Sequence, residues 1–477
     1  MRRTAVLLFV AGLAAACHAP KKRVSQGLPA GDAVWFEDGV GTDTDKIEEM
    51  LARGGVATVF LPAARLSPQG IRWQSNELPP PGRPFSRVSP MLVIEGDRGM
   101  EDALRKKEAI GPLSDAVWLS IKGLLAETRR YGTVAGVHLD FPFSIAAAES
   151  YESLVAFVRA RLPRTQLLTI SLRFTGSSAE EKEKIQRLVS ACDGVLAFVF
   201  GVDNAADPLA VDSLETHWWA GYSVTARGIW ESATGGTRRS LPEWILARFS
   251  DDPRVEFLQN VSLKEESGQS FLLRPRVPIS LGEGFSFGAG DRLSYRQPLV
   301  SDMVYHLAAD VAGRRFARGR VVALPARSES ERLFTLAALV DVLSGKPARP
   351  DLRVGLETGR GAVAVSAENL SPHASVVSRT SNWVEVQIPS GGIRDVQTGG
   401  FDRFEVYGPE RRPVTMGLAT TVRFYETLIS PFEKIEPASI VLRGALPKGC
   451  CETRYHFISA SGQETLSDVL VPTPASR

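Results

Sequence analysis

The sequence predicts an α/β fold: a (β/α)8 TIM-like barrel with insertions over residues 32–346, followed by a C-terminal all-β sandwich over residues 350–472. In the first region, eight short and nearly continuous apolar runs alternate with amphipathic segments, as in a parallel sheet buried on both faces. In the second region, strand-like runs are separated by turn residues, without a strong helix. The alternative for the first region is an open doubly wound sheet, but FEDGVGTDTD lacks the G-x-G-x-x-G of nucleotide-binding sheets.

The expected strands and helices alternate along the first region. The strands are rich in β-branched and other apolar residues and cover 33–39, 56–63, 88–97, 134–141, 166–174, 195–201, 222–230 and 319–327. The helices have apolar residues at helical spacing and cover 43–54, 114–132, 146–163, 178–194, 301–317 and 328–345. Residues 255–282 predict a hairpin inserted before the last unit.

The N-terminus, MRRTAVLLFVAGLAAAC, has the order of regions of an export signal: two arginines, an apolar run and small residues before Cys17. The apolar run is too short to span a bilayer. The ending LAAAC resembles a bacterial lipobox, which predicts a lipoprotein signal over residues 1–17, lipid modification of Cys17 and a flexible tether over residues 18–31. The expected location is the cell envelope, on a bacterial membrane that the sequence does not specify. An ordinary signal peptide cleaved near Ala16 is the alternative.

The composition favours a globular body without a nucleic-acid partner, because the net charge is only +2 and 23% of residues are charged. No cysteine or histidine spacing predicts a zinc site, and no motif predicts a cofactor. In an oxidising compartment, Cys192 has the option of a disulfide with Cys450 or Cys451.

Three stretches together resemble a bacterial lipoprotein family of unknown function (domain of unknown function 3142): VWFEDG, GVHLDFPFS with the helix and strand that follow it, and GRVVALPARSESERLFTLAALVDVLSG. The resemblance spans about residues 30–470 in order. It implies a glycoside-hydrolase-like barrel, an envelope location and a polysaccharide ligand, but no established reaction.

More distantly, AGVHLDFP is similar to the fourth strand of chitinase-type barrels, whose pattern is D-G-x-D-x-D-x-E. Gly136 matches the glycine and Asp140 matches the third acid, whereas His138 stands at the second acid and Pro142 stands at the catalytic glutamate. The resemblance therefore implies a chitinase-like fold without the chitinase-type acid.

Barrel enzymes place their sites at the carboxyl ends of the strands, where this sequence has Glu37, Glu95 and Asp140. Glycoside hydrolysis uses two carboxyl groups about 5–10 Å apart, so Asp140 with Glu37 or Glu95 is the candidate catalytic pair. The alternative is that Asp140 pairs with Arg173 on the next strand, which would lower the pKa of the acid. Such a pair suits a structural role or an anionic-ligand site, for which Arg173 is a candidate contact. His138 points to the same side as Asp140 and is a candidate ligand contact, or a hydrogen-bonded interior histidine.

Aromatic residues near the seventh strand are candidate sugar-stacking platforms: Trp218 and Trp219 in ETHWWAGY, and Trp230 followed by the candidate contact Glu231. If Trp218 and Trp219 lie on a helix, at least one is exposed and the other is in the core. Two hypotheses remain open on this basis. The barrel binds and hydrolyses a polysaccharide, or it is an inactive barrel that binds glycan or assists envelope assembly.

Overall fold

The structure is a computed structural model that describes residues 28–466. The gaps within that range are 38, 41–42, 70–71, 79, 98, 174–177, 203–204, 251, 263–268, 283, 325–333, 360, 390–391, 445–450 and 460–463. The predicted signal peptide and the lipidation residue Cys17 lie outside the described residues. None of the helices in the described part of the chain is long and apolar enough to cross a membrane.

The described residues form a closed barrel of eight parallel strands, which confirms the predicted fold class. The hydrogen-bonded order is β1-β2-β4-β5-β6-β7-β8-β16, and β1 closes the sheet by pairing with both β2 and β16. The strands are β1 (Ala33–Phe36), β2 (Thr58–Gln69), β4 (Ser89–Gly96), β5 (Gly136–Asp140), β6 (Leu167–Leu172), β7 (Gly194–Phe200), β8 (Trp218–Ser223) and β16 (Ala317–Leu324). An antiparallel strand, β3 (Arg72–Glu77), extends β2 beyond the barrel as a hairpin that the sequence analysis did not predict.

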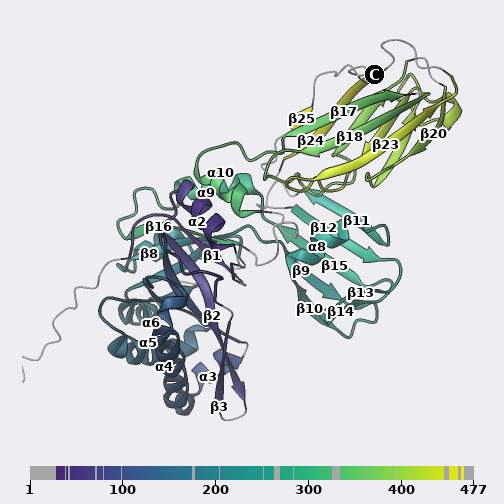
Figure 1. Cartoon of the computed structure of the whole chain (residues 1–477). Helices are drawn as coiled ribbons and strands as arrows, with labels where there is room; N and C mark the ends of the chain where they lie inside the picture. Colours follow the sequence, from purple (N-terminus) through teal and green to yellow (C-terminus); the bar gives the residue numbers. More distant parts are fainter. Residues whose placement is uncertain are drawn as a thin grey trace, which may run out of the picture.

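Helices cover the outside of the barrel, and Figure 1 shows α3 to α6 grouped along one flank. They are α2 (Thr44–Arg53), α3 (Gly99–Arg105), α4 (Ile110–Ala126), α5 (Ala148–Arg161), α6 (Ala179–Ser190), α7 (Pro208–Asp212), α9 (Val300–Ala309) and α10 (Leu336–Leu343). Their starts follow from capping residues: the Asp43 side chain accepts a hydrogen bond from the Lys46 N–H, and Ser178 and Glu181 form a capping box. Their apolar faces pack with the outward-facing residues of the strands into the largest hydrophobic core of the described chain.

The seventh barrel strand lies earlier than predicted. It is β8 (Trp218–Ser223), and not residues 222–230. Trp218 packs outward against the helices and Trp219 packs into the barrel interior, so both side chains are fully buried. The expectation of an exposed tryptophan was therefore wrong, because it placed the pair on a helix, whereas both faces of a barrel strand are buried.

The insertion between β8 and β16 is larger than the predicted hairpin. Its antiparallel sheet has the order β10-β9-β15-β12-β11, with a separate hairpin of β13 and β14. Its elements are β9 (Arg227–Glu231), β10 (Arg238–Leu241), α8 (Glu243–Ser250), β11 (Val255–Ser262), β12 (Gln269–Pro275), β13 (Ile279–Gly282), β14 (Phe285–Phe287) and β15 (Arg292–Gln297). Apolar residues of α8 and of the sheet form a second core, which also includes Ala374, Val377 and Leu428 of the C-terminal region.

The C-terminal region consists of two antiparallel sheets with a common apolar core, β17-β18-β23-β20 and β21-β22-β19-β24-β25. The strands are β17 (Leu352–Gly359), β18 (Ala362–Asn369), β19 (Trp383–Gln387), β20 (Ile393–Gln397), β21 (Arg403–Tyr407), β22 (Thr421–Tyr425), β23 (Lys434–Leu442), β24 (Glu452–Ile458) and β25 (Glu464–Leu466). This is the predicted sandwich. Cys451 takes part in a disulfide whereas Cys192 is a free thiol, so the link considered for Cys192 is not formed.

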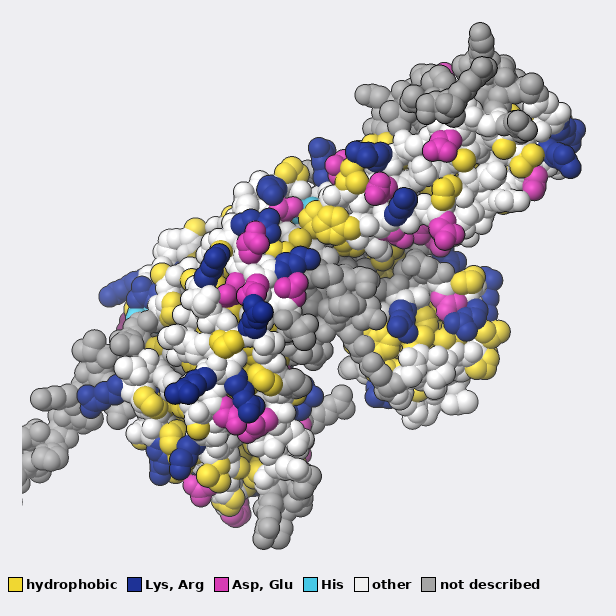
Figure 2. All heavy atoms as spheres, in the orientation of Figure 1, with side chains coloured by type: hydrophobic (Ala, Val, Ile, Leu, Met, Phe, Trp, Pro, Cys, Tyr) yellow, Lys and Arg dark blue, Asp and Glu magenta, His cyan; other side chains and the backbone are white. Residues whose placement is uncertain are grey.

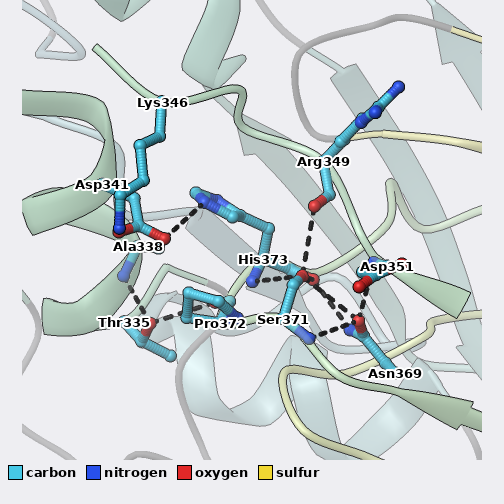
Figure 3. A network of polar contacts seen from close by, with 10 residues as sticks. All are labelled: Thr335, Ala338, Asp341, Lys346, Arg349, Asp351, Asn369, Ser371, Pro372 and His373. Atoms are coloured by element: carbon cyan, nitrogen blue, oxygen red, sulfur yellow. Dashed lines mark hydrogen bonds and ion pairs between the residues drawn. The ribbon is translucent and has the colours of Figure 1, made fainter. Parts of the chain in front are cut away.

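The barrel and the sandwich are joined by a polar network around α10 (Figure 3). The Thr335 hydroxyl accepts from the Ala338 N–H at the start of α10 and donates to the Pro372 carbonyl across the junction. Buried His373 lies 3.6 Å from Asp341 of α10, measured from Nε2 to Oδ2. The sandwich also contacts the inserted sheet, since Arg379 donates to the Val255 carbonyl.

Candidate functional site at the barrel mouth

The barrel interior is filled by side chains and is not a channel. Trp35, Phe60 and Trp219 lie at its centre. The ring centroid of Phe60 is 5.7 Å from that of Trp35 and 5.5 Å from that of Trp219. With smaller apolar residues from the other strands they form a separate buried cluster. Barrel enzymes bind their ligands at the carboxyl ends of the strands, so the mouth is the candidate site in this barrel.

His138 belongs to this filled interior. Its side chain is fully buried, and the Trp35 and Phe60 rings each meet it edge-on with centroids 5.2 Å away. Its Nδ1 lies 2.8 Å from the Thr169 hydroxyl and its Nε2 lies 3.0 Å from the Ser171 hydroxyl. Burial lowers the pKa of His138 to about 4, because the charged form is poorly solvated there. The structure therefore favours the interior role over the ligand contact.

Three acidic residues lie at the mouth, each at the carboxyl end of a strand and in line with the residues of that strand that face the barrel interior. Glu37 continues the alternation of Ala33 and Trp35, Glu95 continues that of Met91 and Val93, and Asp140 follows His138. Glu95 and Asp140 are register partners on the neighbouring strands β4 and β5. Strands lie about 4.8 Å apart, so the two backbones place these carboxylates side by side. Glu37 directly follows β1, which β2 and β4 separate from β5 in the sheet order.

Both neighbouring carboxylates form ion pairs with arginines. Arg65, the register partner of Glu95 on β2, places Nη2 2.6 Å from its carboxylate. Arg173 follows the inward alternation of β6 and places Nη2 3.2 Å from Asp140 Oδ1. The Asp140 side chain is 17% exposed and that of Arg173 is 56% exposed, so this pair lies at an open rim and is not sealed under other side chains.

The remaining predicted contacts lie on the inserted sheet. The structure places Trp230 and Glu231 on β9, and not at the end of a barrel strand. The indole N–H of Trp230 donates to Asp291, 2.8 Å away, and its ring meets Phe287 edge-on. Glu231 lies 3.6 Å from Arg238 of β10. A stacking role for Trp218 and Trp219 is excluded here, because neither side chain is exposed.

The sequence analysis missed a pocket at the end of β7. The pocket has a volume of about 280 Å³ and lies between residues 199–202 of the barrel, the inserted sheet and α9. Arg227 of β9, Arg296 of β15 and His306 of α9 contribute its polar lining. These residues are up to 79 positions apart in sequence (306 minus 227), and only the insertion brings them together, so no local pattern could have indicated the pocket.

The described residues contain no group of three or more His, Cys, Asp or Glu side chains arranged to hold a metal ion. The chemistry available at the mouth is that of carboxylates and guanidinium groups. These side chains accept hydrogen bonds from hydroxyl groups, donate to oxygen atoms and pair with charged substituents.

Comparison of the sequence with protein-family models and with curated proteins gave no match. Among solved structures, the chain is similar to the spore cortex-lytic enzyme SleL of Bacillus cereus, with 11% identity, a TM-score of 0.39, and coverage of 66% of this chain and 74% of that chain. It is also similar to a chitinase-like agglutinin from Robinia pseudoacacia (12% identity, TM-score 0.37, 66% and 98% coverage). A third is a chitinase from Bacteroides thetaiotaomicron (9% identity, TM-score 0.36, 66% and 95% coverage). At these TM-scores the likenesses bear on neither the substrate nor the reaction of this chain.

Proposed function

We propose that this chain is a glycan-binding protein of the cell envelope whose ligand lies across the carboxyl ends of the barrel strands. The observation that supports this most directly is the row of paired charged groups at an open mouth, Arg65 with Glu95 and Arg173 with Asp140. Sugars present neighbouring hydroxyl groups, each of which both donates and accepts. Two adjacent carboxylates flanked by two guanidinium groups offer acceptors and donors that match such a surface.

The same geometry disfavours hydrolysis of the chitinase type. Pro142 occupies the position of the catalytic glutamate in the chitinase-type pattern. His138, which occupies the position of the second acid in that pattern, is buried and hydrogen-bonded to two hydroxyl groups. Asp140 and Glu95 each lie within ion-pair distance of an arginine, whereas a general acid must deliver a proton to the glycosidic oxygen.

A second candidate function, hydrolysis by Glu95 and Asp140, is favoured by one observation. The two residues are register partners on adjacent strands, which is compatible with the carboxyl separation of about 5–5.5 Å in retaining glycosidases. In that case Asp140 or Glu95 would act as the nucleophile and the other as the general acid. The general acid would have to leave its ion pair with arginine and take up a proton.

The test is to incubate the purified protein with a panel of cell-wall and exopolysaccharide fragments, measuring binding by calorimetry and products by mass spectrometry. Asp140→Asn and Arg173→Gln are the test variants. Glu127→Gln is the matched control, because Glu127 forms a comparable ion pair with Arg130 just after α4, at the opposite end of the barrel. We expect binding without products, weakened at least tenfold by either test variant.

The outcomes separate the candidates. Products formed by the parent and not by Asp140→Asn would favour the hydrolase. Equal binding by the parent and both test variants would place the glycan elsewhere, and no binding by the parent would contradict the proposal.

We also propose that Cys17 is lipid-modified and holds the protein on a membrane, as the lipobox-like LAAAC suggests. In a bacterial host, the parent is expected in the membrane fraction and Cys17→Ser in the soluble periplasmic or secreted fraction. Mass spectrometry of the N-terminal peptide distinguishes lipid on Cys17 from cleavage near Ala16, which would contradict the anchor.

A further inference from the structure

We propose that the pocket at the end of β7 binds a carboxylate group of the glycan, so that the ligand is an acidic polysaccharide. This inference rests on the proposed function and adds the chemical class of the ligand.

The pocket opens next to the barrel mouth. Residues 199–202 line it, and they include the carboxyl end of β7 and the residues that follow it. The adjacent strand β6 leads to Arg173, whose guanidinium lies 5.8 Å from the Phe198 ring of β7. A glycan across the mouth that contacts Asp140 and Arg173 would therefore reach the pocket within a few sugar units.

Two arginines give the pocket its charge. Arg227 and Arg296 are register partners on the antiparallel strands β9 and β15, and both side chains line the pocket. Like charges directly opposite each other are unfavourable, and an anion between them relieves that repulsion. Both also interact with other groups of the chain, so a ligand carboxylate would add to those contacts or exchange with them.

The geometry favours a carboxylate on a sugar over a bare ion. Arginine recognises planar carboxylates through paired hydrogen bonds. Phe200 and Pro298 form an apolar side of the pocket. The pocket volume of about 280 Å³ is just below the ~300–1,000 Å³ range that is typical of ligand pockets. That space suits a single substituted sugar.

An exposed aromatic ring stands beside the pocket. Tyr305 is 71% exposed, and its ring centroid lies 5.6 Å from that of His306, which lines the pocket. Exposed aromatic faces suit the C–H faces of pyranoses. Figure 2 shows Lys and Arg side chains together with apolar and acidic ones on the visible face of the inserted region.

The experiment measures the affinity of the full chain, purified in detergent, for paired probes. The acidic probes are oligogalacturonate, oligoalginate and peptidoglycan glycan strands, and their neutral partners are the same oligomers with esterified carboxyl groups. We expect at least one acidic probe to bind tenfold or more tightly than its ester, with an affinity that falls as salt is raised from 50 to about 300 mM.

Arg227→Gln and Arg296→Gln are each expected to reduce that preference at least tenfold. The matched control is Arg292→Gln, since Arg292 lies on the same strand as Arg296 and is exposed, but does not line the pocket. Arg227→Lys retains the charge without the paired geometry and is expected to lie between the parent and Arg227→Gln.

Equal affinity for acidic and esterified probes would overturn the inference and leave the proposed glycan binding intact. So would a preference that both glutamine variants preserve. Failure of the parent to bind any probe, acidic or neutral, would overturn the inference together with the proposed function.

Discussion

The interior of the barrel and its mouth use the same inward-facing strand positions for opposite purposes. In the interior, Trp35 and Phe60 pack edge-on against a buried histidine whose two nitrogens both have hydroxyl partners, and Trp219 packs against Phe60. One step further along, the strands present Glu95 and Asp140, each paired with an arginine that is more than half exposed. The same alternation of inward-facing and outward-facing residues runs through both regions, but water reaches only the residues at the mouth.

This difference separates residues that define the fold from residues that solvent and a ligand can reach. A buried aromatic side chain stabilises by its apolar area and its packing, so its replacement costs stability. An exposed ion pair contributes little to stability, because solvent screens it, and can exchange partners with a ligand at little cost. Each prediction below tests one side of this comparison.

Trp219→Ala should give the largest loss of stability. The side chain is fully buried in the barrel interior, and replacement of a buried large aromatic by alanine typically costs about 3–5 kcal/mol. Urea unfolding followed by circular dichroism measures the loss. Tyr305→Ala, at a position that is 71% exposed, is the control and should change the free energy of unfolding by less than about 0.5 kcal/mol. A small effect of Trp219→Ala would mean that the barrel interior is not packed as described.

His138 should make the barrel less stable in acid. Its pKa is about 4 in the folded chain and about 6.5 when unfolded, so below pH 6.5 the unfolded state binds a proton that the folded state excludes. The stabilisation is complete above pH 6.5 and falls by about 3 kcal/mol as the pH approaches 4.

Burial also lowers the pKa of His217 and of His373, so the measurement must isolate His138. Urea unfolding of the parent and of His138→Gln at pH 7.5 and pH 4.5 provides the comparison. The parent should lose more stability between the two pH values than the variant does. Parallel losses would show that His138 is already solvated.

Thr169→Val should cost about 1–3 kcal/mol, although valine has nearly the same shape as threonine. The change removes the hydroxyl 2.8 Å from His138 Nδ1 and leaves that buried nitrogen without its partner. Calorimetric melting of this variant and of Thr237→Val, a change at an exposed position, gives the comparison. Equal melting temperatures would contradict a structural role for the His138 hydrogen bonds.

The sequence predicted the barrel well because buried parallel strands are nearly continuous apolar runs, and seven of them lie close to where they were expected. It misplaced the seventh because YSVTARGIW (222–230) contains three β-branched residues and WWAGYS contains none, although the end of that run belongs to the inserted sheet. The pairing of Asp140 with Arg173 was predictable from alternation on neighbouring strands. The arginine pocket was not, because it depends on how the insertion folds back on the barrel.

Arg173→Gln should have the smallest effect on stability, below about 1 kcal/mol, because its guanidinium is 56% exposed and its ion pair with Asp140 is open to solvent. The measurement is urea unfolding at pH 7.5, repeated at low and high salt. Arg159→Gln is a useful contrast, since Arg159 and Asp193 form an ion pair whose side chains are each only 12% exposed, and breaking it should cost more. If Arg173→Gln destabilised the barrel as strongly as Trp219→Ala, Asp140 would belong to the structural interior, and the mouth would lose its distinction from the layer beneath it.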